Sequence, residues 1–124
     1  MYPDDLKYST EHEWVRMDGN IAEIGVTVFA QDSLGDVVFI DLPDVGIEIG
    51  QFDKFGEIES VKAVSDLFSP VGGKIVATNP GAIANPETVN TDPYGSGWLI
   101  KIEVSDPAQL DALMDSETYE STLE

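Results

Sequence analysis

The sequence has 124 residues, of which 42% are apolar, and this length and composition suit one domain with a packed core. Its 24 acidic and 6 basic residues give a formal net charge of −18, which argues against binding to nucleic acid or to an anionic membrane and favours basic protein partners, although the charge also serves solubility. Cysteine is absent and His12 is the single histidine, so disulfides and thiolate or multi-histidine metal sites are excluded.

No stretch of the sequence is long and apolar enough to cross a membrane. The first residues are acidic and contain no apolar run, which is unlike a signal or transit peptide. We therefore expect a cytoplasmic protein.

The first third of the sequence predicts a β-hairpin followed by a short helix. Two strand-like runs, 13–17 and 21–26, flank the turn-forming dipeptide Asp18-Gly19. Thr27 can then cap a helix that stops at Gly35, a residue type that commonly terminates helices.

The middle of the sequence predicts a strand and a second hairpin. The strand covers 36–42 and is followed by proline and glycine. Two further runs, 55–60 and 63–68, are separated only by Val61 and Lys62. This spacing predicts a hairpin with Lys62 at its tip.

The last part of the sequence alternates again before it becomes helical. Run 74–78 alternates, 79–96 is irregular and proline-rich, and 98–104 is the clearest half-buried strand. A helix is expected at about 106–116, docked on the sheet by an apolar stripe of Leu110, Leu113 and Met114. Together these elements predict a mainly β fold, a flattened antiparallel β-sandwich or barrel with short helices and a C-terminal helix.

Lys62 is the candidate for chemistry. A lysine at a two-residue hairpin tip is held in water on a narrow support, where a modifying enzyme can reach it and an attached acyl chain can move. The alternative is that this lysine, like many at exposed hairpin tips, serves only solubility. Taken alone, the hairpin position favours the solubility role.

The residues around Lys62 resemble the lipoyl site of glycine cleavage H proteins. The resemblance continues in order through about residues 6–104. It is carried by the following segments: Thr10-Glu11-His12-Glu13-Trp14, Ala30-Gln31-Asp32, Leu34 to Phe39, Leu42-Pro43, Gly46, Glu59 to Ala63, Ser65 to Pro70, Gly73, Asn79, Asn90, Pro93-Tyr94 and Gly97-Trp98.

Related carrier families fit less well. Biotin carriers typically place methionine on both sides of the modified lysine, and lipoyl domains of 2-oxo acid dehydrogenases usually place aspartate before it. Here Val61 and Ala63 are the neighbours, and Val61 is the H-protein form. The sequence departs from the family pattern at Thr88, where an apolar residue is general, and at Gly72, where serine or a similar small residue is usual.

The resemblance implies one lipoyl-carrier domain over 1–124, with a core at about 6–104 and the fold of biotinyl and lipoyl carriers, a barrel-sandwich hybrid. It implies a monomeric, non-catalytic shuttle with lipoate attached covalently to Lys62. In the family the lipoyl group receives an aminomethyl group from glycine on the pyridoxal-phosphate decarboxylase (P protein) and passes it to a tetrahydrofolate-dependent aminomethyltransferase (T protein). Dihydrolipoamide dehydrogenase (L protein) reoxidises the dithiol, and lipoylating enzymes attach the group.

The resemblance also suggests roles for three acids. Glu13 and Asp66 match positions near the lipoyl arm and are candidates for a cradle that holds the amine of the loaded arm. Glu59, three residues before Lys62, is a candidate for recognition by the lipoylating enzyme. The alternative for Glu13 and Asp66 is an ordinary surface acid, and the alternative for Glu59 is an acid that merely stands at the end of a strand. His12 is interpreted as structural or capping, and Trp14 and Trp98 as core residues.

Two other functions remain open from the sequence. The protein could be an H-like protein that donates its lipoyl group to other proteins. It could also be an unmodified acidic interaction module that keeps only the scaffold.

Overall fold

The computed structural model describes residues 2–123. The elements run in chain order as β1 (Lys7–Tyr8), β2 (Glu13–Asp18), β3 (Ile21–Val26), α1 (Val28–Leu34), β4 (Val37–Asp41), β5 (Glu48–Ile49), β6 (Lys54–Ser60), β7 (Val64–Phe68), β8 (Gly73–Thr78), α2 (Pro80–Ala84), α3 (Thr88–Thr91), β9 (Ile100–Val104), the 3₁₀ helix η1 (Pro107–Ala112) and α4 (Ser116–Thr122). No helix among these is long and apolar enough to cross a membrane.

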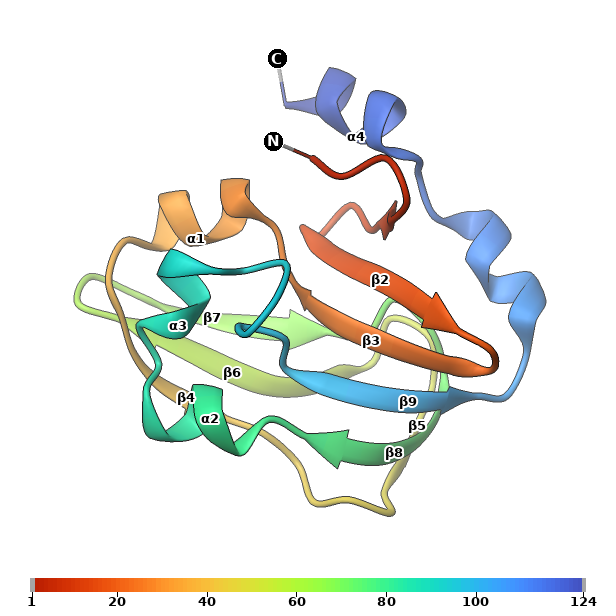
Figure 1. The fold of residues 1–124 in the computed structure, drawn as a ribbon, viewed down its shortest axis with the longest axis horizontal. Helices are drawn as coiled ribbons and strands as arrows, with labels where there is room; N and C mark the ends of the chain where they lie inside the picture. Colours follow the sequence, from red (N-terminus) through yellow and green to blue (C-terminus); the bar gives the residue numbers. More distant parts are fainter. Residues whose placement is uncertain (1, 124) are drawn as a thin grey trace.

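The strands form two antiparallel sheets, which confirms the predicted mainly β sandwich (Figure 1). One sheet has the order β1-β2-β3-β9-β8-β5 and the other the order β4-β6-β7. The sheets do not close into a barrel. Of the two architectures that the sequence predicted, the fold is therefore the sandwich. The β6–β7 hairpin projects at the left of Figure 1, with α1 beside it.

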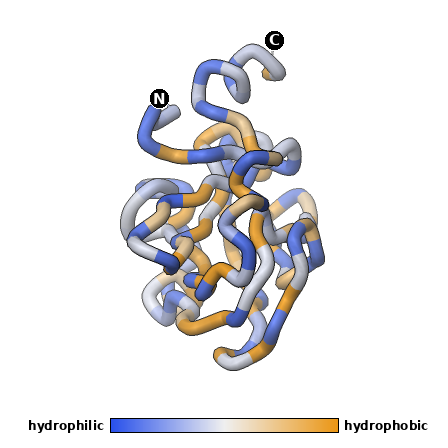
Figure 2. The backbone as a smooth tube through the Cα atoms, turned by 90° about the vertical axis from the view of Figure 1, so that its right-hand side faces the viewer, coloured by the Kyte–Doolittle hydropathy of each residue, from blue (hydrophilic) through white to orange (hydrophobic). Residues whose placement is uncertain are grey.

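The hydrophobic core lies between the two sheets. Ile24 and Ile102 of the larger sheet belong to the same buried cluster as Ile40, Ile58 and Leu67 of the smaller one. Figure 2 shows hydrophobic and hydrophilic positions interleaved along the tube, as expected when one face of each strand is buried. This shared core fixes the β6–β7 hairpin to the rest of the molecule.

Helix α1 forms where the sequence predicted it. The Thr27 side chain accepts a hydrogen bond from the N–H of Ala30 at 3.2 Å, and the Gly35 N–H donates to the carbonyl of Gln31. The hairpin before it differs slightly from the prediction, because its two loop residues are Gly19 and Asn20 rather than the dipeptide Asp18-Gly19.

The predicted C-terminal helix is present as α4, but its expected bounds of about 106–116 and its form as one continuous helix are wrong. The segment contains the short 3₁₀ helix η1, an extended stretch in which Met114 pairs with Tyr8 of β1, and then α4. The Asp115 side chain accepts a hydrogen bond from the N–H of Thr118 and so starts this second helix. Backbone pairing with β1 interrupts the helix that periodicity alone favoured. Figure 1 shows the N-terminal segment and α4 at the same end of the molecule.

The expectation that 79–96 is irregular is also corrected, since it holds α2 and α3. Asn79 accepts hydrogen bonds from the N–H groups of Gly81 and Ala82, and so caps α2. Proline is compatible with the first position of a helix, although in a sequence it usually indicates a break in secondary structure. The strand expected from residue 98 begins at Ile100.

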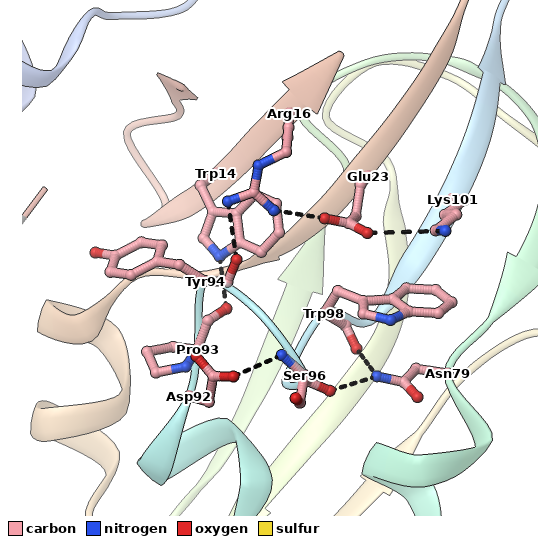
Figure 3. A network of polar contacts seen from close by, with 10 residues as sticks. All are labelled: Trp14, Arg16, Glu23, Asn79, Asp92, Pro93, Tyr94, Ser96, Trp98 and Lys101. Carbon is pink, nitrogen blue, oxygen red and sulfur yellow. Dashed lines mark hydrogen bonds and ion pairs between the residues drawn. The ribbon is translucent and has the colours of Figure 1, made fainter. Parts of the chain in front are cut away.

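A polar network fixes the loop before β9 (Figure 3). Trp14 Nε1 donates to the carbonyl of Pro93 at 3.0 Å, and Arg16 Nη2 donates to the carbonyl of Tyr94 at 2.9 Å. Tyr94 Oη in turn accepts from the N–H of Val28 at the start of α1. The network therefore connects the large sheet to the helix that lies beside the hairpin. Trp14 is fully buried and Trp98 is partly buried in the same cluster, as predicted for core residues.

Candidate functional site: the hairpin lysine and its cleft

The structure places Lys62 at the tip of the β6–β7 hairpin, as its spacing predicted. Ser60 holds the turn together. Its N–H donates to the carbonyl of Ala63 at 2.8 Å, and its hydroxyl oxygen accepts from the N–H of Lys62 at 3.3 Å and of Ala63 at 3.1 Å. Ser60 was not assigned a role from the sequence, although serine before a turn is a known signal for such bonds.

The Lys62 side chain is exposed and lies across Gly35. A Cβ added at Gly35 would lie 3.6 Å from the lysine Cε, and the φ angle of +79° at this position also favours glycine. Within residues 2–123, no ion pair includes Lys62. Its ammonium is therefore available to an incoming enzyme.

Asn90 of α3 holds the backbone beside the lysine. Its amide nitrogen donates to the carbonyl of Gly35 at 2.8 Å, and its amide oxygen accepts from the N–H of Val37 at 2.9 Å. The tip is also attached directly, since the N–H of Val61 donates to the carbonyl of Asp36. Two segments distant in sequence therefore fix the position from which Lys62 projects.

A cleft of about 610 Å³ starts beside the tip and runs between β7, α1 and residues 11–13. Ala63 and Val64 line it near Lys62, and Phe68 lines it at the far end of β7. Both cradle candidates, Glu13 and Asp66, belong to its lining. The structure thus brings these two acids to one cleft beside the lysine.

Glu13 is buried in the cleft wall, with 2% of its surface exposed, so it is not an ordinary surface acid. Ser9 Oγ donates to its Oε1 at 2.5 Å, and the N–H of Phe68 donates to its Oε2 at 3.3 Å. Burial raises the pKa of Glu13 from its usual 4.5 to about 8, although these two hydrogen bonds act to lower it. At neutral pH the carboxyl is therefore mostly protonated.

Asp66 and Glu59 are exposed on the hairpin. Asp66 pairs with Lys54 at 3.1 Å, and Lys54 also contacts Glu57 at 2.7 Å. Glu59 lies on the outer side of β6, opposite Phe39 of β4 and Val64 of β7. The roles suggested for Glu59, Glu13 and Asp66 stay predictions.

His12 has the structural position expected for it. Its Nδ1 lies 2.7 Å from the hydroxyl of Tyr119, which is also 2.8 Å from Oγ1 of Thr27, the cap of α1. Burial lowers the pKa of His12, so the neutral ring is favoured. Tyr119 comes from α4 and had no signal in the sequence, yet it joins two walls of the cleft.

Among residues 2–123, no group of three His, Asp or Glu side chains is placed to hold a metal ion. The features that the hairpin and cleft combine are an exposed amine, an adjoining cleft and a buried acid. This arrangement fits covalent attachment of a flexible chain better than catalysis by the side chains themselves.

Comparison with known proteins gives consistent results. The family model described as Glycine cleavage H-protein matches residues 6–124. A glycine cleavage system H protein of Carboxydothermus hydrogenoformans is 60% identical over 98% of this chain and 94% of that protein. One of Symbiobacterium thermophilum is 56% identical over 96% of this chain and 93% of that protein. The crystal structure of a glycine cleavage system H protein from Mycobacterium marinum matches with a TM-score of 0.87 and 36% identity, covering 98% of each chain.

Proposed function

Because this chain belongs to the glycine cleavage H-protein family, whose members are non-catalytic carriers with lipoate on a lysine, we propose that Lys62 is the lipoylated residue. The supporting observation is its position as an exposed amine at a two-residue tip beside the cleft, with no ion pair to any other residue of 2–123. When bound, the lipoyl group supplies a disulfide that accepts the aminomethyl group of glycine.

The cleft is long enough for such an arm. Val64 to Phe68 spans four residue steps of about 3.3 Å, or about 13 Å in all. The reach of a lipoyl-lysine is on the order of 10 Å. An arm that follows β7 would therefore end near Asp66, Phe68 and Glu13, all of which line the cleft.

Peptide mapping after lipoylation in vitro tests the attachment site. We expect an added lipoyl mass on Lys62 and none in the Lys62→Arg variant, because a guanidinium keeps the charge but is a poor acyl acceptor. Lys54→Arg is the matched control, since it changes an exposed lysine of the same hairpin that is held in ion pairs. Modification mainly on another lysine would overturn the assignment.

We propose further that Glu13 and Asp66 retain the loaded arm. The amine of the carried aminomethyl group is cationic when protonated, whereas an unloaded arm has no such cation. A buried carboxyl that is neutral in the empty cleft can bind this amine and lose its own proton, and the nearby Asp66 adds negative charge. The arm would then rest in the cleft only when loaded, through differential contacts.

The combined variant Glu13→Gln and Asp66→Asn tests this cradle. We expect unchanged lipoylation and a several-fold faster release of formaldehyde from the isolated loaded protein, because about 1.4 kcal/mol changes a rate tenfold. Glu48→Gln combined with Asp44→Asn makes the same two kinds of substitution away from the cleft and serves as control. Equal release from the cradle variant and the parent protein would refute a role for both acids.

The partners proposed for the loaded and unloaded arm are the P, T and L proteins, together with a lipoylating enzyme. The whole chain is proposed to act as one domain, supported by a core cluster that includes both sheets and Leu113. A monomer is proposed because a net charge of −18 opposes self-association and a shuttle must leave each partner. Light scattering and cell fractionation test the monomer and the proposed cytoplasmic location.

A further inference from the structure

The outer face of the three-stranded sheet exposes an apolar group around the base of Lys62. Its members, which we call the tip patch, are Val38 and Phe39 of β4, Val61 of the tip and Val64 of β7. Their exposed fractions are 50%, 57%, 70% and 59%, respectively. Four large apolar side chains this exposed at one end of a small, highly acidic protein indicate a binding surface.

An irregularity in β4 creates part of the tip patch. The pairing register of β4 with β6 shifts between Val37 and Phe39, which inserts one extra residue. As a result Val38 and Phe39 are both exposed, where strict alternation would turn one of them inward, and Ile40 returns to the core. Bulges of this kind often redirect side chains at functional sites.

Glu59 lies at the centre of the tip patch. Phe39, Glu59 and Val64 are direct neighbours in one row across the three strands. Within residues 2–123, no ion pair reaches Glu59, whereas the next acid on the same face of β6, Glu57, is paired with Lys54. The surface complementary to this row is apolar with a basic group opposite Glu59.

The length of the lysine side chain indicates which partner enzyme must contact the tip patch. From Cα to Nζ, a lysine spans five bonds of about 1.5 Å, a reach of roughly 6 Å. An enzyme that acylates Nζ must therefore bring its own surface onto the residues around the tip. Enzymes that act on the end of the lipoyl-lysine arm can stay several ångströms farther away. The geometry therefore does not require them to contact the residues around the tip.

We propose that the tip patch, with Glu59 at its centre, is the docking surface for the enzyme that attaches the lipoyl group. This inference rests on the proposed lipoylation of Lys62. The co-reactant is lipoyl adenylate, the activated form of lipoate. The deprotonated Nζ forms a bond to the lipoyl carbonyl carbon, the bond from that carbon to the adenylate oxygen breaks, AMP leaves, and one proton from Nζ goes to solvent.

Lipoylation kinetics with a purified ATP-dependent lipoate–protein ligase test the proposal. We expect Phe39→Ser to raise the KM for the protein substrate roughly tenfold with little change in kcat, as for loss of one anchoring aromatic side chain. Phe52→Ser is the matched control, because Phe52 is 49% exposed but lies in the loop between β5 and β6. An unchanged KM for Phe39→Ser, or an equal change for Phe52→Ser, would overturn the proposal.

A binding assay that needs no acylation completes the test. Lys62→Arg keeps the tip patch and should inhibit lipoylation of the parent protein competitively, whereas Lys62→Arg combined with Phe39→Ser should inhibit about tenfold less. Equal inhibition by the two variants would contradict docking through this surface. Circular dichroism and urea unfolding establish that each variant is folded.

Two further outcomes separate this inference from the assignments it rests on. If the parent protein is modified on another lysine, the proposed function fails before docking is tested. If Phe39→Ser is lipoylated like the parent but is loaded poorly by the glycine decarboxylase, the tip patch serves that enzyme and the inference is wrong.

Discussion

Glu13→Gln should remove part of the dependence of the protein's stability on pH. Burial raises the pKa of Glu13 from 4.5 to about 8 in the folded protein, so the folded state holds this proton more tightly than the unfolded state does. The contribution of Glu13 to the free energy of unfolding is therefore most favourable below pH 4.5. It falls as the pH rises toward 8 and is constant above that value.

The size of the effect follows from the shift. Each pH unit inside this window changes the free energy of unfolding by about 1.4 kcal/mol. Between pH 5.5 and pH 8.5, roughly two and a half units lie inside the window, which corresponds to about 3 kcal/mol. Glutamine keeps the shape and the acceptor oxygen for Ser9 but does not titrate, so this dependence should disappear in the variant.

Urea unfolding of both proteins at pH 5.5 and pH 8.5, at constant ionic strength, measures the effect. The stability of Glu13→Gln relative to the parent should rise by about 3 kcal/mol between the lower and the higher pH. Glu11→Gln, which neutralises the exposed neighbour, should show much less change. A difference between parent and Glu13→Gln that is the same at both pH values would show that Glu13 is already ionised in the folded state, and the burial argument would be refuted.

Three further predictions concern other parts of the molecule. Tyr119→Phe should destabilise the protein by about 1–3 kcal/mol, because it removes the hydroxyl that bonds both the partly buried His12 ring and the buried Thr27 side chain, and it should speed loss of the aminomethyl group from the loaded protein. Tyr8→Phe should lower stability by only about 0.5–1.5 kcal/mol without changing that loss, and urea unfolding and formaldehyde release measure both variants. Gly25→Ala should lower the free energy of unfolding by about 1–3 kcal/mol, since its Cβ would lie 2.7 Å from the Trp14 ring, and a normal melting temperature would contradict this packing. The association rate with the glycine decarboxylase should fall as salt rises from about 0.05 to about 0.5 M, and a flat rate would assign the acidic surface to solubility alone.

Several local features could be predicted from the sequence because neighbouring residues determine them. The two-residue spacing between strand-like runs is sufficient to place Lys62 at a tip. Thr27 and Gly35 likewise mark the two ends of α1, because capping bonds join residues only three or four positions apart. The motifs around Lys62 also indicated the family, and the comparisons confirm that membership.

The C-terminal helix shows where local signals were insufficient. Its apolar spacing favoured one helix, but backbone bonds between Met114 and Tyr8 of β1 require an extended segment there. Those bonds connect residues more than a hundred positions apart in the sequence. Periodicity reports only which side chains share a face, so it contains no information about such a partner.

The chemical character of the site was decided by tertiary structure in the same way. The sequence marked Glu13 as an acid near the arm, but only the tertiary structure buries it, places it against the N–H of Phe68 and raises its pKa. Asn90 beside the lysine and Tyr119 behind the cleft come from segments far from the hairpin. Turns and caps arise from neighbours in the chain, whereas burial and long-range hydrogen bonds exist only after distant segments have packed together.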